Sequence, residues 1–182
     1  MAQLIMDSPI GALFIDASDR GIRLMSFIGG TKHDSLVEGL GEQTPAPHSL
    51  ADKLLDEAQR QLKAYFSGDL QRFDLPLDVK GSPFRQKVWQ AIASIPYGET
   101  ASYAEVAAMA GAPNAYRAAG SACGANPVAV IVPCHRVVGS DRALHGFGGG
   151  LGTKVWLLRH EGSLAAIRPS LATAHARQSS LI

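Results

Sequence analysis

The sequence predicts an α/β protein of two domains, a small α/β domain followed by a mainly helical domain that contains a helix-turn-helix. Two apolar runs around a turn and then an amphipathic helix make up the first half, whereas helical spacing dominates after Ser82. Lys80-Gly81 forms a short linker between these patterns. We therefore predict one domain over residues 1–80, a second over residues 81–164, and a C-terminal tail over residues 165–182.

The first domain is expected to begin with a β-hairpin and to continue through a loop into one helix. The hairpin comprises strand 8–17, turn 18–21 and strand 22–27, and the loop covers 29–47. Ser49 to Asp52 is a capping pattern that opens a helix, which ends near Ser67-Gly68. The alternating Phe73, Leu75 and Leu77 predict a further short strand.

The second domain is expected to begin with a helix at Ser82-Pro83, where proline occupies the first turn. Two short helices follow, one over 103–110 and one over 114–125 with Asn114 as its N-cap. Gly111-Ala112-Pro113 makes the turn between them, which is helix-turn-helix spacing, although an ordinary helical hairpin gives the same pattern.

The rest of the second domain combines a buried segment with a glycine-rich loop. The β-branched run 128–132 predicts a strand buried on both faces, and this strand ends at Pro133-Cys134-His135-Arg136. The glycines of 146–152 lack the order of a phosphate-binding loop, which argues against a nucleotide triphosphatase. A last helix is predicted from Thr153 to Glu161.

Composition and charge exclude several classes of protein. The only cysteines, Cys123 and Cys134, are too few for a disulfide framework and lack zinc-site spacing, so we expect no metal. No apolar run is long enough to span a membrane and no signal peptide is evident, which predicts a soluble cytoplasmic protein. The net charge is −4 over residues 1–82 and +5 over residues 83–182, so a polyanion is expected to bind the second half.

Cys134 is the candidate nucleophile. A thiol reacts as the thiolate, and the neighbouring His135 and Arg136 are residue types that lower a thiol pKa. Because adjacent side chains of an extended chain point to opposite faces, we expect a water to relay the proton from Cys134 to His135. Glu161 could hold the other imidazole nitrogen, which would give a Cys/His/Glu relay.

The segment from Asn126 to Gly139, which contains Pro133-Cys134-His135-Arg136, resembles the active-site signature of the O6-alkylguanine-DNA alkyltransferases, also called methylated-DNA–protein-cysteine methyltransferases. The resemblance covers residues 8–162. The other matching segments, in chain order, are Ser8-Pro9-Ile10-Gly11, Ser82-Pro83-Phe84, Val88-Trp89, Ile95-Pro96-Tyr97-Gly98, Ser102-Tyr103, Arg117-Ala118-Ala119-Gly120, Trp156-Leu157-Leu158 and His160-Glu161-Gly162.

The resemblance implies a ribonuclease-H-like first domain and a winged-helix-like second domain. It further implies irreversible, stoichiometric transfer of an alkyl group from O6-alkylguanine in double-stranded DNA to Cys134, with no cofactor. His135 would activate Cys134, Glu161 would support His135, and Asn126 would orient the loop around the cysteine. Tyr103 would protonate guanine N3 as the alkyl group leaves, since a neutral guanine leaves more easily than its anion.

The same resemblance implies which residues bind DNA. Arg117 would fill the stack when the damaged nucleotide is flipped, which is needed because a buried thiol cannot otherwise reach the O6 position. The small residues around it form a face that can approach the minor groove closely without reading sequence. The implied DNA-binding residues are Arg117, Ala118, Ala119, Gly120, Ser121 and Arg136, and the implied base pocket consists of Tyr103, Val137, Phe147, Gly148 and Gly149.

Differences from particular members of the family argue against three of its subtypes. The first half has no cysteine, so the zinc site of some members is not expected, and there is no cysteine-rich N-terminal module of the combined sensor–activator type. Cys134 is present, whereas a non-repairing branch replaces it. We expect a monomer that does not bind membranes. Cooperative assembly on DNA and activity on O4-alkylthymine stay open.

Three alternatives to alkyl transfer are also compatible with the sequence. A helix-turn-helix regulator without chemistry would prefer one DNA sequence and would not depend on Cys134. A thiol hydrolase using Cys134, His135 and Glu161 would turn over after a burst. A lesion-sensing protein that recruits other repair factors would bind damaged DNA without a gain of mass on Cys134.

Overall fold

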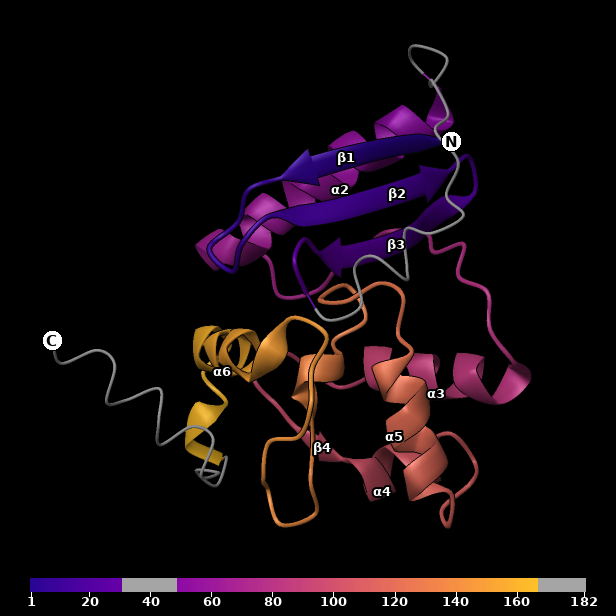
Figure 1. Ribbon diagram of the computed structural model, residues 1–182, viewed down its shortest axis with the longest axis vertical. Helices are drawn as coiled ribbons and strands as arrows, with labels where there is room; N and C mark the ends of the chain where they lie inside the picture. Colours follow the sequence, from indigo (N-terminus) through magenta and orange to yellow (C-terminus); the bar gives the residue numbers. More distant parts are fainter. Residues whose placement is uncertain (31–48, 167–182) are drawn as a thin grey trace, which may run out of the picture. The chain divides into compact units, whose positions relative to one another are not determined.

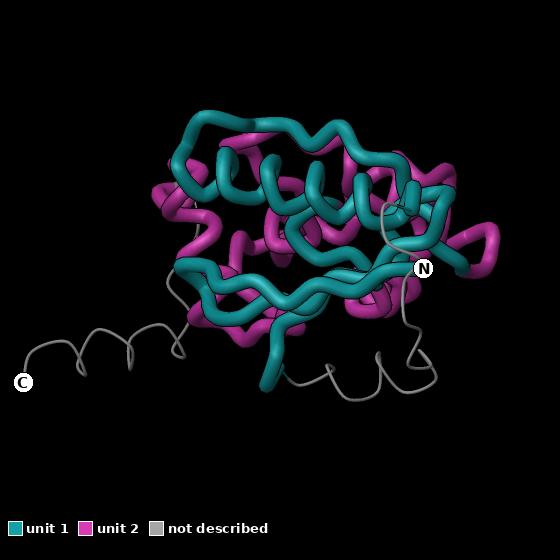
Figure 2. The backbone as a smooth tube through the Cα atoms, turned by 90° about the horizontal axis from the view of Figure 1, so that it is seen from above, with its two compact units in different colours: residues 1–80, 127–131 teal, residues 81–126, 132–182 magenta. Residues whose placement is uncertain are grey.

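The computed structural model describes residues 1–30 and 49–166 (Figure 1). The predicted loop 29–47 lies almost entirely outside the described residues, as does the predicted tail after Ala166. The chain divides into two compact units (Figure 2). Unit 1 comprises residues 1–80 and 127–131, and unit 2 comprises residues 81–126 and 132–182. Unit 1 thus includes a segment that the sequence analysis assigned to the second domain.

Unit 1 contains a three-stranded antiparallel sheet in the order β1-β2-β3. The strands are β1 (Ala2–Met6), β2 (Leu13–Ser18) and β3 (Gly21–Phe27). The hairpin of β2 and β3 confirms the predicted one, but its first strand begins only at Leu13 because Gly11 N–H bonds Ser8 O in a turn. Strand β1, which the sequence analysis did not predict, pairs with β2 along its whole length.

Helix α2 (Leu50–Ser67) packs on one face of this sheet (Figure 1). The helix begins as predicted, since Ser49 and Asp52 form a capping box, and it ends at Gly68, whose φ of 88° suits glycine. Its buried side includes Leu55, Ala58 and Leu62 at helical spacing.

Two predicted strands, the one at Phe73 to Leu77 and the one at 128–132, are reduced to single bridges beside β3. Leu77 bridges to Ile22, and Val128 bridges to Met25. Residues 128–132 are buried, as predicted, but they do not form a strand, because Val130 has a φ of 66° and Ile131 N–H turns back to Ala129 O. The first of these segments approaches β3 so closely that a Cβ on Gly21 would lie 2.5 Å from Pro76 O.

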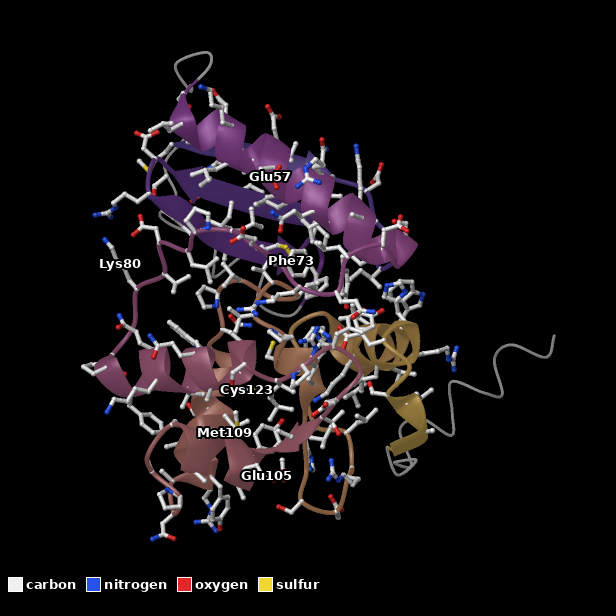
Figure 3. The ribbon with its side chains drawn as sticks, turned by 180° about the vertical axis from the view of Figure 1, so that it is seen from behind. Glu57, Phe73, Lys80, Glu105, Met109 and Cys123 are labelled. Atoms are coloured by element: carbon white, nitrogen blue, oxygen red, sulfur yellow. The ribbon has the colours of Figure 1, made fainter. Side chains whose placement is uncertain are left out.

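Unit 2 contains α3 (Pro83–Ala93), α4 (Tyr103–Met109), α5 (Tyr116–Gly124) and α6 (Gly150–His160). Helix α3 starts at Ser82-Pro83 as predicted, and Trp89 Nε1–H ties it to Ala122 O of α5. Helices α4 and α5 form the predicted pair, with Met109 at the end of α4 (Figure 3). Two 3-10 turns, η1 (Cys134–Arg136) and η2 (Leu164–Ala166), complete its helical elements among the described residues.

Two predicted helix starts in unit 2 are wrong. Asn114 is not an N-cap, because Ala115 N–H closes a turn onto Ala112 O and α5 begins only at Tyr116, without a side-chain cap. Helix α6 begins at Gly150 instead of Thr153, so part of the predicted glycine loop is helical.

A two-stranded parallel sheet positions the site of unit 2. Strand β4 (Ala101–Ser102) pairs with β5 (Val137–Val138), in the register Ala101 to Val137 and Ser102 to Val138. Strand β4 leads directly into α4, and β5 follows η1 directly. The start of α4 and the turn that carries Cys134 are therefore held side by side.

Candidate active site

Cys134 is buried at the start of η1, with 7% of its surface exposed. The chain here forms a 3-10 turn, not the extended conformation assumed above, and Cys134 N–H bonds Val132 O at 2.8 Å. Asn126 Nδ2 donates to Val132 O at 2.8 Å and to Cys134 Sγ at 3.2 Å. One amide group thus fixes the backbone before the turn and contacts the sulfur.

The surroundings of Cys134 lower its pKa below the ordinary 9.0. A hydrogen bond from the Cys123 thiol is the largest cause, burial opposes it, and the Asn126 amide and the Lys154 ammonium lower the pKa further. Cys123 belongs to α5 and is labelled in Figure 3, and its Sγ lies 3.9 Å from Cys134 O. Cys134 is therefore set up to react as a thiolate.

Behind the cysteine, Glu161 connects two side chains of η1. His135 Nε2 lies 2.8 Å from Glu161 Oε1, and Arg136 reaches the same carboxylate with Nε at 2.8 Å and Nη2 at 3.0 Å. Arg136 Nη1 also donates to Ile95 O at 2.6 Å. All three members of this ion-pair group are at least 95% buried.

The charges in this group determine the state of the imidazole. Burial lowers the pKa of His135 despite the opposing effect of Glu161, so the ring is neutral near pH 7. Burial alone would raise the pKa of Glu161, but hydrogen bonds from His135 and Arg136 bring it to about 2. A neutral imidazole beside a carboxylate donates through Nε2–H, so Nδ1 carries the lone pair. Nδ1 is buried and has no hydrogen-bond partner among the described residues.

Tyr103 is the first residue of α4, which Ser102 and Glu105 fix with a capping box. Its half-buried ring would lie 3.6 Å from a Cβ on Gly120 of α5 and is 6.0 Å from the His145 ring. Burial, and then the two nearby thiols, raise the pKa of Tyr103. The phenol is therefore protonated at neutral pH and available as a donor.

Apart from Tyr103 at the start of α4, the residues predicted to line a base pocket occupy the segment between η1 and α6. Val137 is buried, and its carbonyl accepts a hydrogen bond from Lys154 Nζ at 2.7 Å. The ring of Phe147 meets His135 edge to face at 6.4 Å. Gly148 and Gly149 are partly exposed.

Sequence reasoning missed Lys154, a buried lysine of α6. It stands at helical spacing with the buried Leu157 and Leu158, and a charged residue in an apolar stripe was the available signal.

The predicted DNA-binding residues divide into two groups. Arg117, Ala118 and Ser121 are exposed on α5, and Gly120 is partly exposed. Ala119 and Arg136 instead are buried, at 0% and 5% exposure, and the guanidinium of Arg136 is held by Glu161. These two positions do not favour direct contact with DNA.

The part of the chain that the structure describes contains neither a candidate membrane span nor a candidate metal site. None of its helices is long and apolar enough to cross a membrane. No group of three or more His, Cys, Asp or Glu there is arranged to hold a metal ion.

Family models match both halves of the chain. The model described as "6-O-methylguanine DNA methyltransferase, ribonuclease-like domain" matches residues 1–79. The model described as "6-O-methylguanine DNA methyltransferase, DNA binding domain" matches residues 83–163. Together they span almost all of the described residues.

Individual proteins agree with the family models. The methylated-DNA–protein-cysteine methyltransferase of Methanosarcina barkeri is 44% identical over 157 residues, which cover 86% of this chain and 94% of the relative. That of Mycobacterium leprae is 45% identical, over 86% of this chain and 89% of the relative. The crystal structure of Mycobacterium tuberculosis OGT in complex with DNA has a TM-score of 0.75 and 42% identity, over 88% of this chain and 92% of that one. These similarities show that the chain belongs to the methylated-DNA–protein-cysteine methyltransferase family.

Proposed function

We propose that this chain repairs DNA by direct reversal, with Cys134 accepting the alkyl group of an O6-alkylguanine in duplex DNA. Each molecule acts once and no cofactor takes part. The observation that carries the proposal is the arrangement around the sulfur, in which Asn126 contacts Sγ and a neutral His135 is backed by Glu161. DNA inside the cell, in the cytoplasm, is the expected partner.

Proton removal from Cys134 is assigned to His135. The lone pair of Nδ1 takes the thiol proton through a bridging water, and Glu161 stabilises the imidazolium that forms. Asn126 Nδ2–H stabilises the developing thiolate. Neither step needs a metal ion.

The thiolate then attacks the alkyl carbon, so that a carbon–sulfur bond forms as the bond from carbon to O6 breaks. The electron pair of the broken bond stays on guanine, which takes a proton from Tyr103 at N3 and leaves as a neutral base. The proton held by His135 returns to the Tyr103 phenolate through solvent. The raised pKa of Tyr103 favours that return.

Access to the lesion requires the nucleotide to leave the stack, at a cost of a few kcal/mol. Arg117 is exposed on α5 and is proposed to fill the space left in the duplex. The pocket is assigned to Tyr103, the Val137 carbonyl and Phe147, with Gly148 and Gly149 at its edge. The exposed Ala118 and Ser121 let α5 approach the minor groove.

The test is the intact mass of the full chain after mixing with a duplex that contains one O6-methylguanine. We expect one added methyl group per protein, mapped to Cys134 and not to Cys123, with unmodified guanine left in the DNA. Cys134→Ser is expected to bind the same duplex and gain no mass.

Other outcomes would replace the proposal. An unchanged mass with the lesion intact would support a sequence-specific regulator or a lesion sensor. Continued release of product after one equivalent would support a thiol hydrolase.

A further inference from the structure

Lys154 is a buried cation that has no carboxylate partner in the part of the chain that the structure describes. Only 1% of its surface is exposed, and its Nζ donates to Val137 O at 2.7 Å and to His145 O at 3.3 Å. Both acceptors are neutral carbonyls, and Lys154 forms no ion pair with any residue that the structure describes. Burying a charge in this way is costly unless an opposite charge lies nearby.

The other titratable groups around the site do not supply that opposite charge. Glu161 is already neutralised by Arg136, and His135 is uncharged near pH 7. Tyr103 stays protonated because its pKa is raised. Among the described residues, the groups that act on Lys154 as potential negative charges are the thiols of Cys123 and Cys134.

Backbone contacts connect the ammonium to the turn that carries Cys134. The Val137 carbonyl accepts from Lys154 Nζ, and the N–H of the same residue donates to Cys134 O. Lys154 therefore holds the peptide that follows η1 in place, and its ammonium is one of the charges that act on Cys134. Burial lowers the pKa of Lys154 and the two thiols oppose that change, as expected for a cation next to potential thiolates.

We propose that Lys154 is a positioning residue for the transfer reaction, whose ammonium is the counter-charge of the buried Cys134 thiolate and holds the Val137 carbonyl at the base pocket. This inference rests on the proposed function. It gives α6 a second part in the reaction besides Glu161 at its C-terminal end. On deprotonation of Cys134 the proton leaves toward His135, and a thiolate–ammonium pair stays behind in the interior.

The experiment separates charge from hydrogen bonding. Lys154→Gln keeps a donor for the two carbonyls and loses the charge, Lys154→Met loses both, and Lys154→Arg keeps the charge. Lys87→Gln, on the exposed side of α3 in the same unit, is the matched control. For each folded variant, thiolate absorbance is titrated against pH without DNA, with Cys134→Ser as the blank, and single-turnover methyl transfer is measured across the same pH range.

We expect Lys154→Gln and Lys154→Met to raise the thiol pKa by roughly one unit or more, and to lower the transfer rate at pH 7 by roughly tenfold or more. Raising the pH should restore the rate, and Lys154→Arg and Lys87→Gln should keep the thiol pKa low. An unchanged thiol pKa in both uncharged variants would overturn the inference, whatever happens to the rate. If either uncharged variant fails to fold, the other gives the answer, and if both fail while Lys154→Arg folds with an ordinary thiol pKa, the inference is also wrong.

The titration needs neither DNA nor transfer, so the two proposals fail separately. A wild-type chain that gains no methyl group contradicts the proposed function, yet its Cys134 pKa still tests the pairing with Lys154.

Discussion

At the scale of single residues, Glu161 stabilises the site by binding two residues of η1, His135 and Arg136. Its carboxylate binds His135 and Arg136 at the same time, inside unit 2. A buried ion pair of this kind adds little net stability when complete, but the loss of one partner leaves charges buried without compensation. The same carboxylate is therefore expected to matter both for stability and for the proposed transfer reaction.

Glu161→Ala is expected to lower the free energy of unfolding by about 3–5 kcal/mol, because the Arg136 guanidinium is left buried without its carboxylate. Alkyl transfer should slow as well, since nothing then fixes the His135 tautomer. Urea unfolding and single-turnover transfer measure the two effects. Glu99→Ala, at an exposed position of the same unit, is the control. Equal stability of the two variants would contradict the assigned role.

Acid is expected to destabilise the fold by protonating this group. The pKa of Glu161 falls from 4.5 to about 2 on folding, so its contribution is complete above pH 4.5 and is lost as the pH falls toward 2. The pKa of His135 also falls from 6.5, so protonation of the unfolded chain destabilises the fold below pH 6.5. Melting temperatures of wild type and Glu161→Gln measured against pH test this. A difference between them that does not change from pH 5 to pH 2 would contradict it.

At the scale of elements, α5 combines mostly small side chains with a single cationic side chain, that of Arg117. Its buried residues include Ala119, Ala122 and Cys123, which face the interior of unit 2. The exposed Arg117 lies 5.6 Å from the ring centre of Tyr116, a cation–π contact at the start of the helix. Such a helix suits lesion search better than the reading of base edges, which needs several polar side chains.

Arg117→Ala is expected to slow transfer from a paired lesion by roughly tenfold, because 1.4 kcal/mol of lost stabilisation lowers the flipped population by that factor. A single-stranded or extrahelical O6-methylguanine should be repaired at close to the normal rate, since no stack has to be filled. Single-turnover rates on both substrates test this, with the exposed Arg85→Ala on α3 as the control. Equal slowing on both substrates would exclude the stack-filling role.

At the scale of the whole molecule, the chain enters unit 1 a second time at residues 127–131. Val128, Ala129, Val130 and Ile131 are buried, and Met25 of β3 bonds the backbone of this segment on both sides. A fragment of residues 81–166 would lack these partners although it retains all the proposed site residues.

That fragment is expected to be less stable than the full chain and to bind hydrophobic dyes, because the apolar segment 127–131 loses its partners in unit 1 and becomes exposed. Thermal melting and dye fluorescence measure this, with the full chain as reference. A fragment that melts at the same temperature and accepts a methyl group at the normal rate would show that the segment needs no partner from unit 1.

The sequence by itself determined the family, the candidate acceptor Cys134 and most helix boundaries. The capping box at Ser49 and the proline after Ser82 are local signals, because caps act within one helical turn. Hydrophobic spacing likewise predicted the hairpin of β2 and β3. These features depend on neighbours along the chain and can be read from it.

Only the tertiary structure decided what the buried segments do. In the folded protein the expected strand 128–132 forms only a single bridge, and Arg136 pairs with Glu161 instead of lying on the surface. The tertiary structure also revealed Lys154 beside the Val137 carbonyl. The physical reason is shared by all three: burial removes water, so backbone groups and charges must find partners that are distant in the sequence, and local patterns do not specify which partners those are.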